Sequence, residues 1–475
     1  MNIALAQIKV KCGDFAFNYK NVTSKIEGID CDMIIFPSCD ISQMDGGDLA
    51  DDEKCIIEQV KFYDDIAQKN YNKAIFIGDV LINNGEIVKS ENGFYNINGE
   101  TIYVSDRIED EIECDTYILT KNRYYTEEFS QEFVEMEDSP YNFIYINAIG
   151  FQNGNVYAGG SFAKNKNGRL IADFPICEES VQLLDFAVFT KNIEIPKEEE
   201  WLKVTTFALK EYCENTGLKK VVLGLSGGID SAITAVLATL ALGEENVLGI
   251  LMPSVFSSQG SVDDSIKLAQ NLGIKTAKHS ISPMFDVFME KYAHETLDTS
   301  GQENLAVENL QARLRAVILM YFSNRDGRLL LSTGNKSEAA MGYGTLYGDM
   351  AGGLNLIADL TKTKVYKLSN YINRNGEIIP QEIIDKAPSA ELRPNQKDQD
   401  SLPDYEVLDD IIEMYVEQNL SPDTIYEKYD KQLVDEVIRK IYRAEFKRRQ
   451  ACLGVRLTKN AFFKGVNLPV TQNIY

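Results

Sequence analysis

The chain has 475 residues, more than a single hydrophobic core usually serves, so we expect two or three domains. Its 48 Lys and Arg against 72 Asp and Glu leave a net charge of −24, which argues against a nucleic-acid partner. Eight cysteines without a CxxC pair and two histidines argue against a zinc ribbon and a three-histidine zinc site. With no secretory signal pattern and no apolar stretch near the roughly 20 residues that cross a bilayer, we expect a cytoplasmic protein that does not contact membranes.

The first half of the chain predicts an α/β domain over residues 1–192. Strand patterns cover 2–10, 32–37, 74–78 and 143–147, and a helix is expected over 18–26. Asn84-Gly85 and Asn98-Gly99 predict tight hairpin turns, because Asn-Gly reaches positive φ at little steric cost.

The second half, 197–475, predicts a doubly wound α/β domain. After a proline and a run of charges comes a regular alternation, with strands expected over 221–225, 247–252 and 276–280, and helices over 201–216, 230–242 and 262–272. Strands separated by helical patterns of this length indicate βαβ crossovers and a parallel sheet.

The segment with the clearest chemistry lies between the first strand of this sheet and the following helix. It comprises Gly224, Leu225, Ser226, Gly227, Gly228, Ile229, Asp230 and Ser231. Paired glycines let the backbone approach an anion, and a helix N-terminus offers free N–H groups and a positive dipole. Asp230 beside phosphates needs a cation, so we interpret it as a magnesium ligand. The alternative is an ordinary tight turn capped by Asp230.

This string is neither a Walker A loop nor a dinucleotide fingerprint. It resembles the pyrophosphate loop of ATP pyrophosphatases, a group that includes NAD, GMP and asparagine synthetases. Further motifs follow in the order found in NAD synthetases, and the resemblance covers the chain from about Lys197 onward. These motifs are Met252-Pro253-Ser254, Glu308 to Arg315, Ser332 to Glu338, Tyr347-Gly348-Asp349, Pro388 to Leu392 and Glu445 to Gln450.

The resemblance implies roles for individual residues. Asp230, Glu338 and Lys362 are the expected catalytic residues, and Asp230 and Glu338 the expected magnesium ligands. ATP is expected to contact Gly224, Ser226, Gly227, Gly228, Asp230, Ser231, Thr333, Lys362 and Ser389. Deamido-NAD is expected to contact Asn309, Arg313, Asp349 and Lys447. The ordinary alternatives are a solvated helix face for Arg313, a structural ion pair for Glu338, and a helix C-terminus for Lys447.

The family reaction activates a carboxylate and then amidates it. The nicotinate carboxylate of deamido-NAD attacks the α-phosphorus of ATP, pyrophosphate leaves, and ammonia then displaces AMP. Positioning and charge neutralisation by Mg²⁺ and cationic side chains carry most of this chemistry, which suits a chain with few histidines. The resemblance also implies a homo-oligomer.

The first half resembles the nitrilase-like amidase domain of glutamine-dependent NAD synthetases, in shortened form. That domain uses a glutamate base, a lysine and a cysteine nucleophile. Here Ser38 stands where the glutamate is expected after Phe36-Pro37, the lysine segment offers no lysine, and the nucleophile segment is missing. We therefore expect a pseudo-amidase and free ammonia as the nitrogen source. The alternatives are a nucleophile rebuilt from Cys39 or Cys114, a separate ammonia-supplying glutaminase, or a catalytically dead nucleotide-binding assembly protein.

Overall fold

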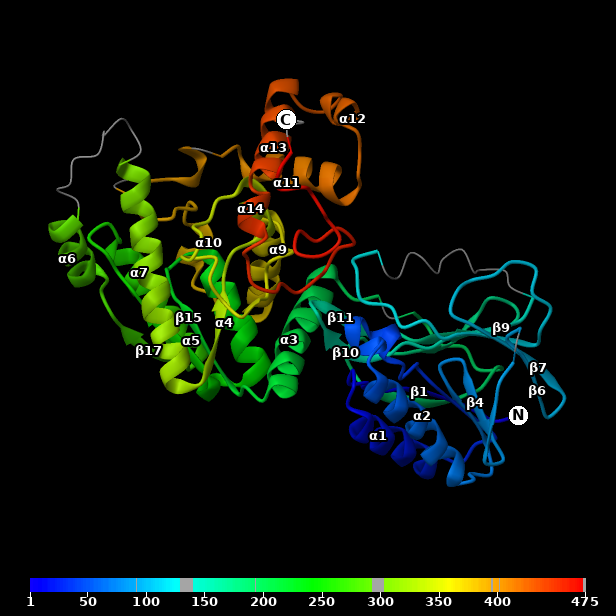
Figure 1. Cartoon of the computed structure of the whole chain (residues 1–475). Helices are drawn as coiled ribbons and strands as arrows, with labels where there is room; N and C mark the ends of the chain where they lie inside the picture. The colour runs from blue at the N-terminus through cyan, green and yellow to red at the C-terminus, as the bar shows by residue number, and fades with distance from the viewer. Residues whose placement is uncertain are drawn as a thin grey trace. The chain divides into compact units, whose positions relative to one another are not determined.

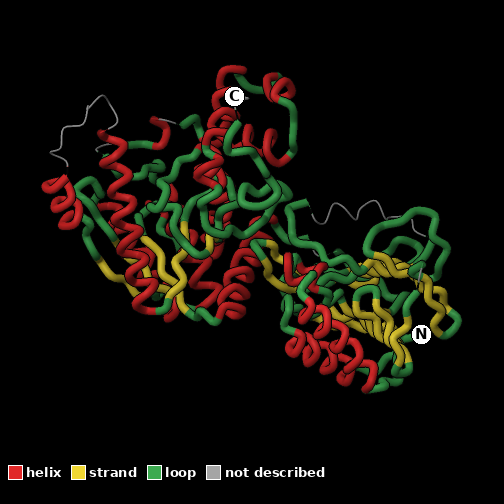
Figure 2. Tube along the Cα trace, viewed as in Figure 1, coloured by secondary structure: helices red, strands yellow, loops and turns green. Residues whose placement is uncertain are grey.

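The computed structural model describes residues 1–90, 92–128, 140–192, 194–292, 303–393, 396–400 and 402–472. The chain divides into two compact units, the N-terminal unit Met1–Pro196 and the C-terminal unit Lys197–Tyr475 (Figure 1). The N-terminal unit is rich in strands, whereas the C-terminal unit carries most of the helices (Figure 2). None of the described helices combines the length and the apolar character that a membrane span requires.

The N-terminal unit contains two six-stranded sheets, of which the first has the order β14-β1-β2-β3-β4-β5. Its strands are β1 (Ile3–Gln7), β2 (Met33–Phe36), β3 (Ala74–Ile77), β4 (Val80–Asn83), β5 (Glu86–Val88) and β14 (Ser180–Leu184). The three strands β1, β2 and β3 are parallel, and the outer strands join antiparallel. The predicted strands in this region are confirmed.

The second sheet has the order β13-β12-β9-β8-β7-β6. Its strands are β6 (Phe94–Ile97), β7 (Glu100–Ser105), β8 (Thr116–Leu119), β9 (Asn142–Tyr145), β12 (Phe162–Lys164) and β13 (Leu170–Asp173); β10 (Ile149–Gln152) and β11 (Asn155–Ala158) form a separate hairpin. Both predicted Asn-Gly turns are present, and Asn84, Gly85, Asn98 and Gly99 all have positive φ.

The core of this unit lies between the two sheets. Ile35 and Phe76 of the first sheet pack in one buried cluster with Ile102 and Ile144 of the second. Helices α1 (Phe15–Gly28) and α2 (Glu53–Gln68) cover the outer face of the first sheet (Figure 1). Over the outer face of the second sheet, the described residues form a buried aromatic cluster that includes Tyr117. The expected shortened α/β sandwich is confirmed.

The C-terminal unit is built on a parallel sheet with the order β17-β16-β15-β18-β19. Its strands are β15 (Lys220–Gly224), β16 (Val247–Leu251), β17 (Lys275–Lys278), β18 (Arg328–Ser332) and β19 (Leu354–Asn355). The strand order reverses at β15, and such a reversal opens a crevice at the carboxyl ends of the strands.

Helices cover both faces of this sheet. On one face α3 (Lys197–Thr216), α4 (Ile229–Leu242), α5 (Gln259–Leu272) and α9 (Lys362–Ile372) pack against one another. On the other face, next to α6 (Ser282–Tyr292), helix α7 (Glu303–Asp326) places Phe322 against Val222 and Ile250 of the sheet. The predicted doubly wound fold is confirmed.

All four predicted helices begin earlier than expected, α1 by three residues and α4 by one. Helices α3 and α5 begin four and three residues earlier, each for a local reason. Helix α3 begins at Lys197 because Glu198, Glu199 and Glu200 place negative charge in its first turn, where the helix dipole favours it. Helix α5 begins at Gln259 because the Ser258 side chain caps it by accepting from the Ser261 amide.

The remaining helices come after β18 in the chain and extend the C-terminal unit. They are α8 (Lys336–Met341), α10 (Gln381–Asp385), α11 (Tyr405–Ile412), a π-helical turn (Glu413–Glu417), α12 (Pro422–Tyr426), α13 (Lys431–Arg443) and α14 (Glu445–Arg448). Leu408 and Ile412 of α11 pack with Val437 and Ile441 of α13 and with Ala340 of α8. This cluster fixes α8 beside the carboxyl end of β18.

Candidate active site

The central strand β15 leads into a loop of small residues that ends at helix α4. Gly227 in this loop has a φ of +79°, a conformation that glycine adopts without strain. The Ser226 and Ser231 hydroxyls lie 3.1 Å apart, and the Ser231 hydroxyl donates to the Gly228 carbonyl at 3.0 Å. The loop is therefore held by its own hydroxyls, and it ends where the first N–H groups of α4 lack helical partners. This arrangement is suited to phosphate groups.

Alanine at Gly227 is expected to disrupt the loop. The added Cβ would lie 2.4 Å from the Ser261 carbonyl oxygen. We expect Gly227→Ala to lower the free energy of unfolding by about 2 kcal/mol or more and to remove stabilisation by ATP, measured by denaturation with and without the nucleotide. Gly217→Ala is the matched control, because Gly217 has a φ of +74° with nothing within 4 Å of an added Cβ. Equal effects in the two variants would contradict the role of the close approach.

The loop forms one wall of a cavity of about 350 Å³ at the carboxyl ends of β15, β16 and β18. The residues of the expected site that line it are Gly224, Ser226, Gly228, Asp230, Ser231, Thr333, Glu338, Asp349, Lys362 and Ser389. These residues come from the glycine loop and the start of α4, from the turn after β18, from α8, from the segment between α8 and β19, from α9, and from the segment after α10. Segments separated by more than a hundred residues of sequence thus converge on one cavity.

Two carboxylates and one ammonium group meet in this cavity. The Lys362 ammonium lies 2.5 Å from Asp230 Oδ2 and 3.7 Å from Glu338 Oε1. Burial and the charge of Asp230 raise the pKa of Glu338 to about 8. Burial alone would lower the pKa of Lys362, but the two carboxylates raise it overall. The two acids are therefore incompletely neutralised by Lys362.

The donor set fits a magnesium ion. Mg²⁺ is usually held by one or two carboxylates while phosphates and water supply the other ligands. Asp230 and Glu338 both approach the same ammonium group. Burial and the Asp230 charge raise the pKa of Glu338, so a cation beside the two carboxylates would stabilise its ionised form. Among the described residues no cluster of three or more His, Cys, Asp or Glu could hold a metal by itself.

Asn335 fixes the orientation of both acids, a role that the sequence analysis missed. Its side chain accepts from the Glu338 amide at 2.9 Å, while the Glu338 carboxylate accepts from the Asn335 amide at 3.1 Å. The other end of the Asn335 side chain donates to Asp230 Oδ1 at 3.1 Å. The capping-box spacing from Asn335 to Glu338 was a signal for the first pair of contacts, but the contact with Asp230 spans 105 residues.

The residues expected to bind deamido-NAD gather around a second loop, 342–349. Asn309 accepts from the Thr345 hydroxyl at 2.9 Å, and Arg313 donates to the Leu346 carbonyl at 3.1 Å. Asp349 accepts from the Thr345 amide at 2.6 Å, and Lys447 donates to the Gly342 and Gly344 carbonyls at 2.7 Å each. Of these four expected residues, only Asp349 lines the cavity, and Arg313 is exposed. Asn309, Arg313 and Lys447 therefore contact loop 342–349 but do not line the cavity.

Further charged residues line the cavity without having been assigned a role from the sequence, among them Arg315, Lys386 and Glu391. Arg315 is partly buried and donates to the Met252 carbonyl at 3.1 Å, and desolvation lowers its pKa to about 10. Glu391 accepts from the Ser261 hydroxyl at 2.6 Å and pairs with Lys386 at 3.1 Å. Helical spacing alone left Arg315 indistinguishable from a solvated residue.

The N-terminal unit has a separate polar cavity of about 420 Å³. Its lining includes Ser38 after β2, Ser105 at the end of β7, and Thr120 after β8. No lysine or cysteine is among its described lining residues. The Ser38 hydroxyl instead accepts from the Asp40 amide at 3.1 Å.

The two candidate replacement nucleophiles are poorly suited to attack. Burial, assisted by Asp40, raises the pKa of Cys39 to about 12. Burial, assisted by Asp115, raises the pKa of Cys114 to about 11. Cys114 also precedes β8, whereas Thr120 in the cavity follows it, and a strand of this length separates its two ends by roughly 13 Å. Neither thiol resembles an activated nucleophile.

Comparison with known proteins gives matches over both units. The family model of NAD synthase matches residues 201–451. A glutamine-dependent NAD(+) synthetase from Synechocystis sp. is 42% identical over 339 residues, which covers 69% of this chain and 60% of that protein. One from Aquifex aeolicus is 41% identical over 388 residues, covering 73% of this chain and 68% of that protein. This chain thus spans about 60% of the length of the first of these relatives.

Solved structures match along nearly the whole chain. A glutamine-dependent NAD+ synthetase from Acinetobacter baumannii, in complex with ADP, is similar with a TM-score of 0.75 and 28% identity, covering 99% of this chain and 98% of that one. A glutamine-dependent NAD(+) synthetase from Cytophaga hutchinsonii has a TM-score of 0.84 and the same coverage at 18% identity, which shows the fold alone. With the family model matching more than half of the sequence, this chain belongs to the NAD synthase family.

Proposed function

We propose that this chain is an NAD synthetase, a ligase that forms a carbon–nitrogen bond. An oxygen of the deamido-NAD carboxylate attacks the α-phosphorus of ATP, and the bond to pyrophosphate breaks. Ammonia then attacks the resulting acyl carbon, and AMP leaves with the oxygen that had bridged carbon and phosphorus. The observation that carries this proposal is the pairing of Lys362 with Asp230 and Glu338 beside the glycine loop, in a chain of this family.

The ATP-binding role falls on the loop and the residues that face it. Backbone N–H groups around Gly227 and the hydroxyls of Ser226 and Ser231 hold the pyrophosphate portion, while Thr333 and Ser389 contact the rest of the nucleotide. Lys362 supplies a fixed positive charge where negative charge develops on the α-phosphate. The positive φ of Gly227 and the hydroxyl contacts of Ser226 and Ser231 support the assignment of the loop.

Asp230 and Glu338 are the residues that would hold Mg²⁺. When bound, the ion would neutralise phosphate charge and polarise the phosphoryl group. Asn335 orients the two carboxylates, and Lys362 lies within reach of both. Loop 342–349, supported by Asn309, Arg313, Asp349 and Lys447, positions deamido-NAD against the nucleotide.

The nitrogen source has two candidates. The relatives are named as glutamine-dependent enzymes, so they favour glutamine and do not support ammonia as the only donor. The cavity of the N-terminal unit has Ser38 in place of the expected base and no thiol in its described lining, which favours ammonia as the molecule that this chain itself uses. We propose that glutamine contributes through a separate glutaminase, with this chain amidating from ammonia.

Steady-state kinetics with ammonium or glutamine as the donor test this part. We expect ammonium to support NAD formation and glutamine to support at most a hundredth of that rate with the purified chain. Comparable rates would overturn the pseudo-amidase and favour a rebuilt nucleophile, which Cys39→Ala and Cys114→Ala would then locate. If the chain forms no AMP with either donor, the result would favour the alternative of a nucleotide-binding assembly protein without catalytic activity.

The cysteine thiols give an independent prediction. At pH 8, raising a thiol pKa from 9 to about 11 reduces the thiolate fraction about 100-fold. We expect Cys114 to react with iodoacetamide about 100-fold more slowly than an unperturbed thiol, and Cys39 more slowly still, as followed by peptide mass spectrometry. Labelling of either thiol at the rate of free cysteine would contradict this environment.

We also propose that the chain forms a homo-oligomer, since two-domain proteins of the resembled type assemble in this way. We propose the cytoplasm as its compartment. Light scattering of the purified chain measures its stoichiometry.

A further inference from the structure

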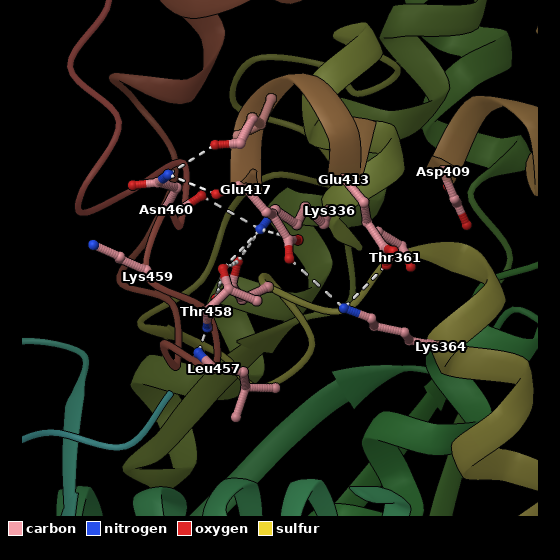
Figure 3. A network of polar contacts seen from close by, with 12 residues as sticks. Lys336, Thr361, Lys364, Asp409, Glu413, Glu417, Leu457, Thr458, Lys459 and Asn460 are labelled. Atoms are coloured by element: carbon pink, nitrogen blue, oxygen red, sulfur yellow. Dashed lines mark hydrogen bonds and ion pairs between the residues drawn. The ribbon is translucent and has the colours of Figure 1, made fainter. Parts of the chain in front are cut away.

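A lysine with no exposed surface lies immediately behind the proposed magnesium site. Lys336 is the first residue of α8, and its ammonium lies 2.7 Å from Asp359 Oδ1 and 2.8 Å from Glu417 Oε1. It also donates to the Thr458 hydroxyl at 2.9 Å (Figure 3). Burying an ammonium group is costly unless it is paired and fully hydrogen-bonded. Lys336 meets this condition, because two carboxylates and a hydroxyl surround its ammonium group.

The network around Lys336 joins segments that are distant in sequence. Asp359 accepts from the Leu457 and Thr458 amides at 2.8 and 2.7 Å and from the Thr458 hydroxyl. Glu417 belongs to the π-helical turn, whose carbonyls accept from the Asn460 side chain. Figure 3 shows the Lys336 ammonium between Glu417 and Thr458. We call Lys336, Asp359, Glu417 and Thr458 the Lys336 network.

The Lys336 network lies close in sequence to two residues of the candidate site, Glu338 on α8 and Lys362 on α9. Glu338 follows Lys336 by two residues on α8, so the two side chains leave the helix on opposite sides. Lys362 follows Asp359 by three residues at the start of α9. The backbone amide of Lys336 also donates to the Leu360 carbonyl at 2.8 Å. A displacement of Lys336 or Asp359 therefore changes the separation of Glu338 and Lys362.

A second set of contacts ties the same two helices together. The Ser337 hydroxyl accepts from the Lys362 amide at 2.8 Å and donates to Asp409. Asp409 also accepts from the Thr363 amide at 2.7 Å. These bonds define the distance between α8 and α9, whereas the Lys336 network defines how α8 is placed at its first residue. Thr458 lies beyond residues 201–451, so part of the network comes from outside the region that the family model matches.

We propose that the Lys336 network is a positioning device that sets Glu338 relative to Lys362 for metal and ATP binding. The inference rests on the proposed function, because it assigns the network to that site. Lys336 does not touch the cavity, so it acts through the placement of α8. The C-terminal segment that contains Thr458 is accordingly part of the synthetase machinery.

The test uses the full chain with Lys336→Met, which removes the charge, and Thr458→Val, which removes one hydroxyl at nearly equal volume. Lys428→Met is the control, because Lys428 forms an exposed pair with Asp410. Binding of Mn²⁺ in the presence of α,β-methylene-ATP is measured by calorimetry, below the unfolding temperature of each variant. Steady-state kcat and KM are measured in parallel.

We expect Lys336→Met to weaken Mn²⁺ binding at least fivefold and to lower kcat at least tenfold, with the KM for deamido-NAD within twofold of wild type. Thr458→Val is expected to shift metal affinity two- to threefold in the same direction, and Lys428→Met to leave it unchanged. A folded Lys336→Met chain with wild-type metal affinity would overturn the proposal. Should that variant fail to fold, unchanged metal affinity in Thr458→Val overturns it.

The binding measurement separates this inference from the proposed function. A wild-type chain that binds Mn²⁺ and the ATP analogue but forms no NAD would refute the reaction and leave the positioning role standing on its own variants. A wild-type chain that binds neither would overturn both.

Discussion

Asp230→Asn is expected to slow the formation of AMP and pyrophosphate at least about 1,000-fold, equivalent to roughly 4 kcal/mol of transition-state stabilisation. Asparagine has nearly the same shape as aspartate but cannot supply the charge that the metal and Lys362 require. Asp230 lies 2.5 Å from Lys362 and also accepts from Asn335. Quenched-flow measurement of AMP at saturating ATP and Mg²⁺ gives the rate.

The fold is expected to survive this change. Removing the Asp230 charge lowers the pKa of Glu338, because that charge is one of the causes that raise it. Lys362 then keeps Glu338 as its carboxylate partner. Asp263→Asn is the matched control. Asp263 is exposed on α5, and its carboxylate accepts a hydrogen bond from the Gln259 side chain on the same helix. A folded Asp230→Asn chain that keeps more than a tenth of the wild-type rate would refute the assignment of this acid.

Lys362→Met is expected to produce a comparable loss of rate together with a new dependence of stability on pH. The folded protein raises the pKa of Glu338 from 4.5 to about 8, so this group destabilises the fold as the pH rises through that interval. Without the Lys362 ammonium the pKa of Glu338 rises further, because a neighbouring positive charge lowers it in the wild type. The loss of stability must therefore grow with pH.

Urea denaturation in EDTA at pH 6 and pH 9 measures this effect. We expect the difference in the free energy of unfolding between wild type and Lys362→Met to be larger at pH 9 than at pH 6. Lys428→Met, which removes an exposed ammonium, is expected to show no such trend. A difference that is constant or smaller at pH 9 would show that Lys362 does not neutralise Glu338.

The sequence predicted the fold of both units because its signals were local. Strands such as β2 and β16 are short apolar runs ended by proline or a turn. The glycine loop is recognisable in the sequence because its glycines and serines stand between a strand pattern and a helix pattern. Helix starts were displaced where charge or capping decided them, as at Lys197 and Gln259. The spacing of apolar residues, from which the helix bounds were predicted, does not depend on a capping residue or on carboxylates in the first turn.

The candidate site was predictable only in part. The glycine loop and the family resemblance pointed to Asp230, Glu338 and Lys362, and the structure brings these three together. It could not identify Asn335 as the residue that links the two acids, nor Arg315 as a residue that lines the cavity. The Lys336 network was equally hidden, since its members come from four segments that only the folded chain brings together.

Transfer of labelled oxygen tests the central claim most directly. The full chain is incubated with ATP, Mg²⁺, ammonium and deamido-NAD carrying ¹⁸O in both oxygens of its nicotinate carboxylate, and the products are analysed by mass spectrometry. Adenylation of the carboxylate predicts one ¹⁸O in each AMP and one in each NAD amide. AMP without ¹⁸O, or ATP cleaved to ADP with the label in inorganic phosphate, would contradict the account.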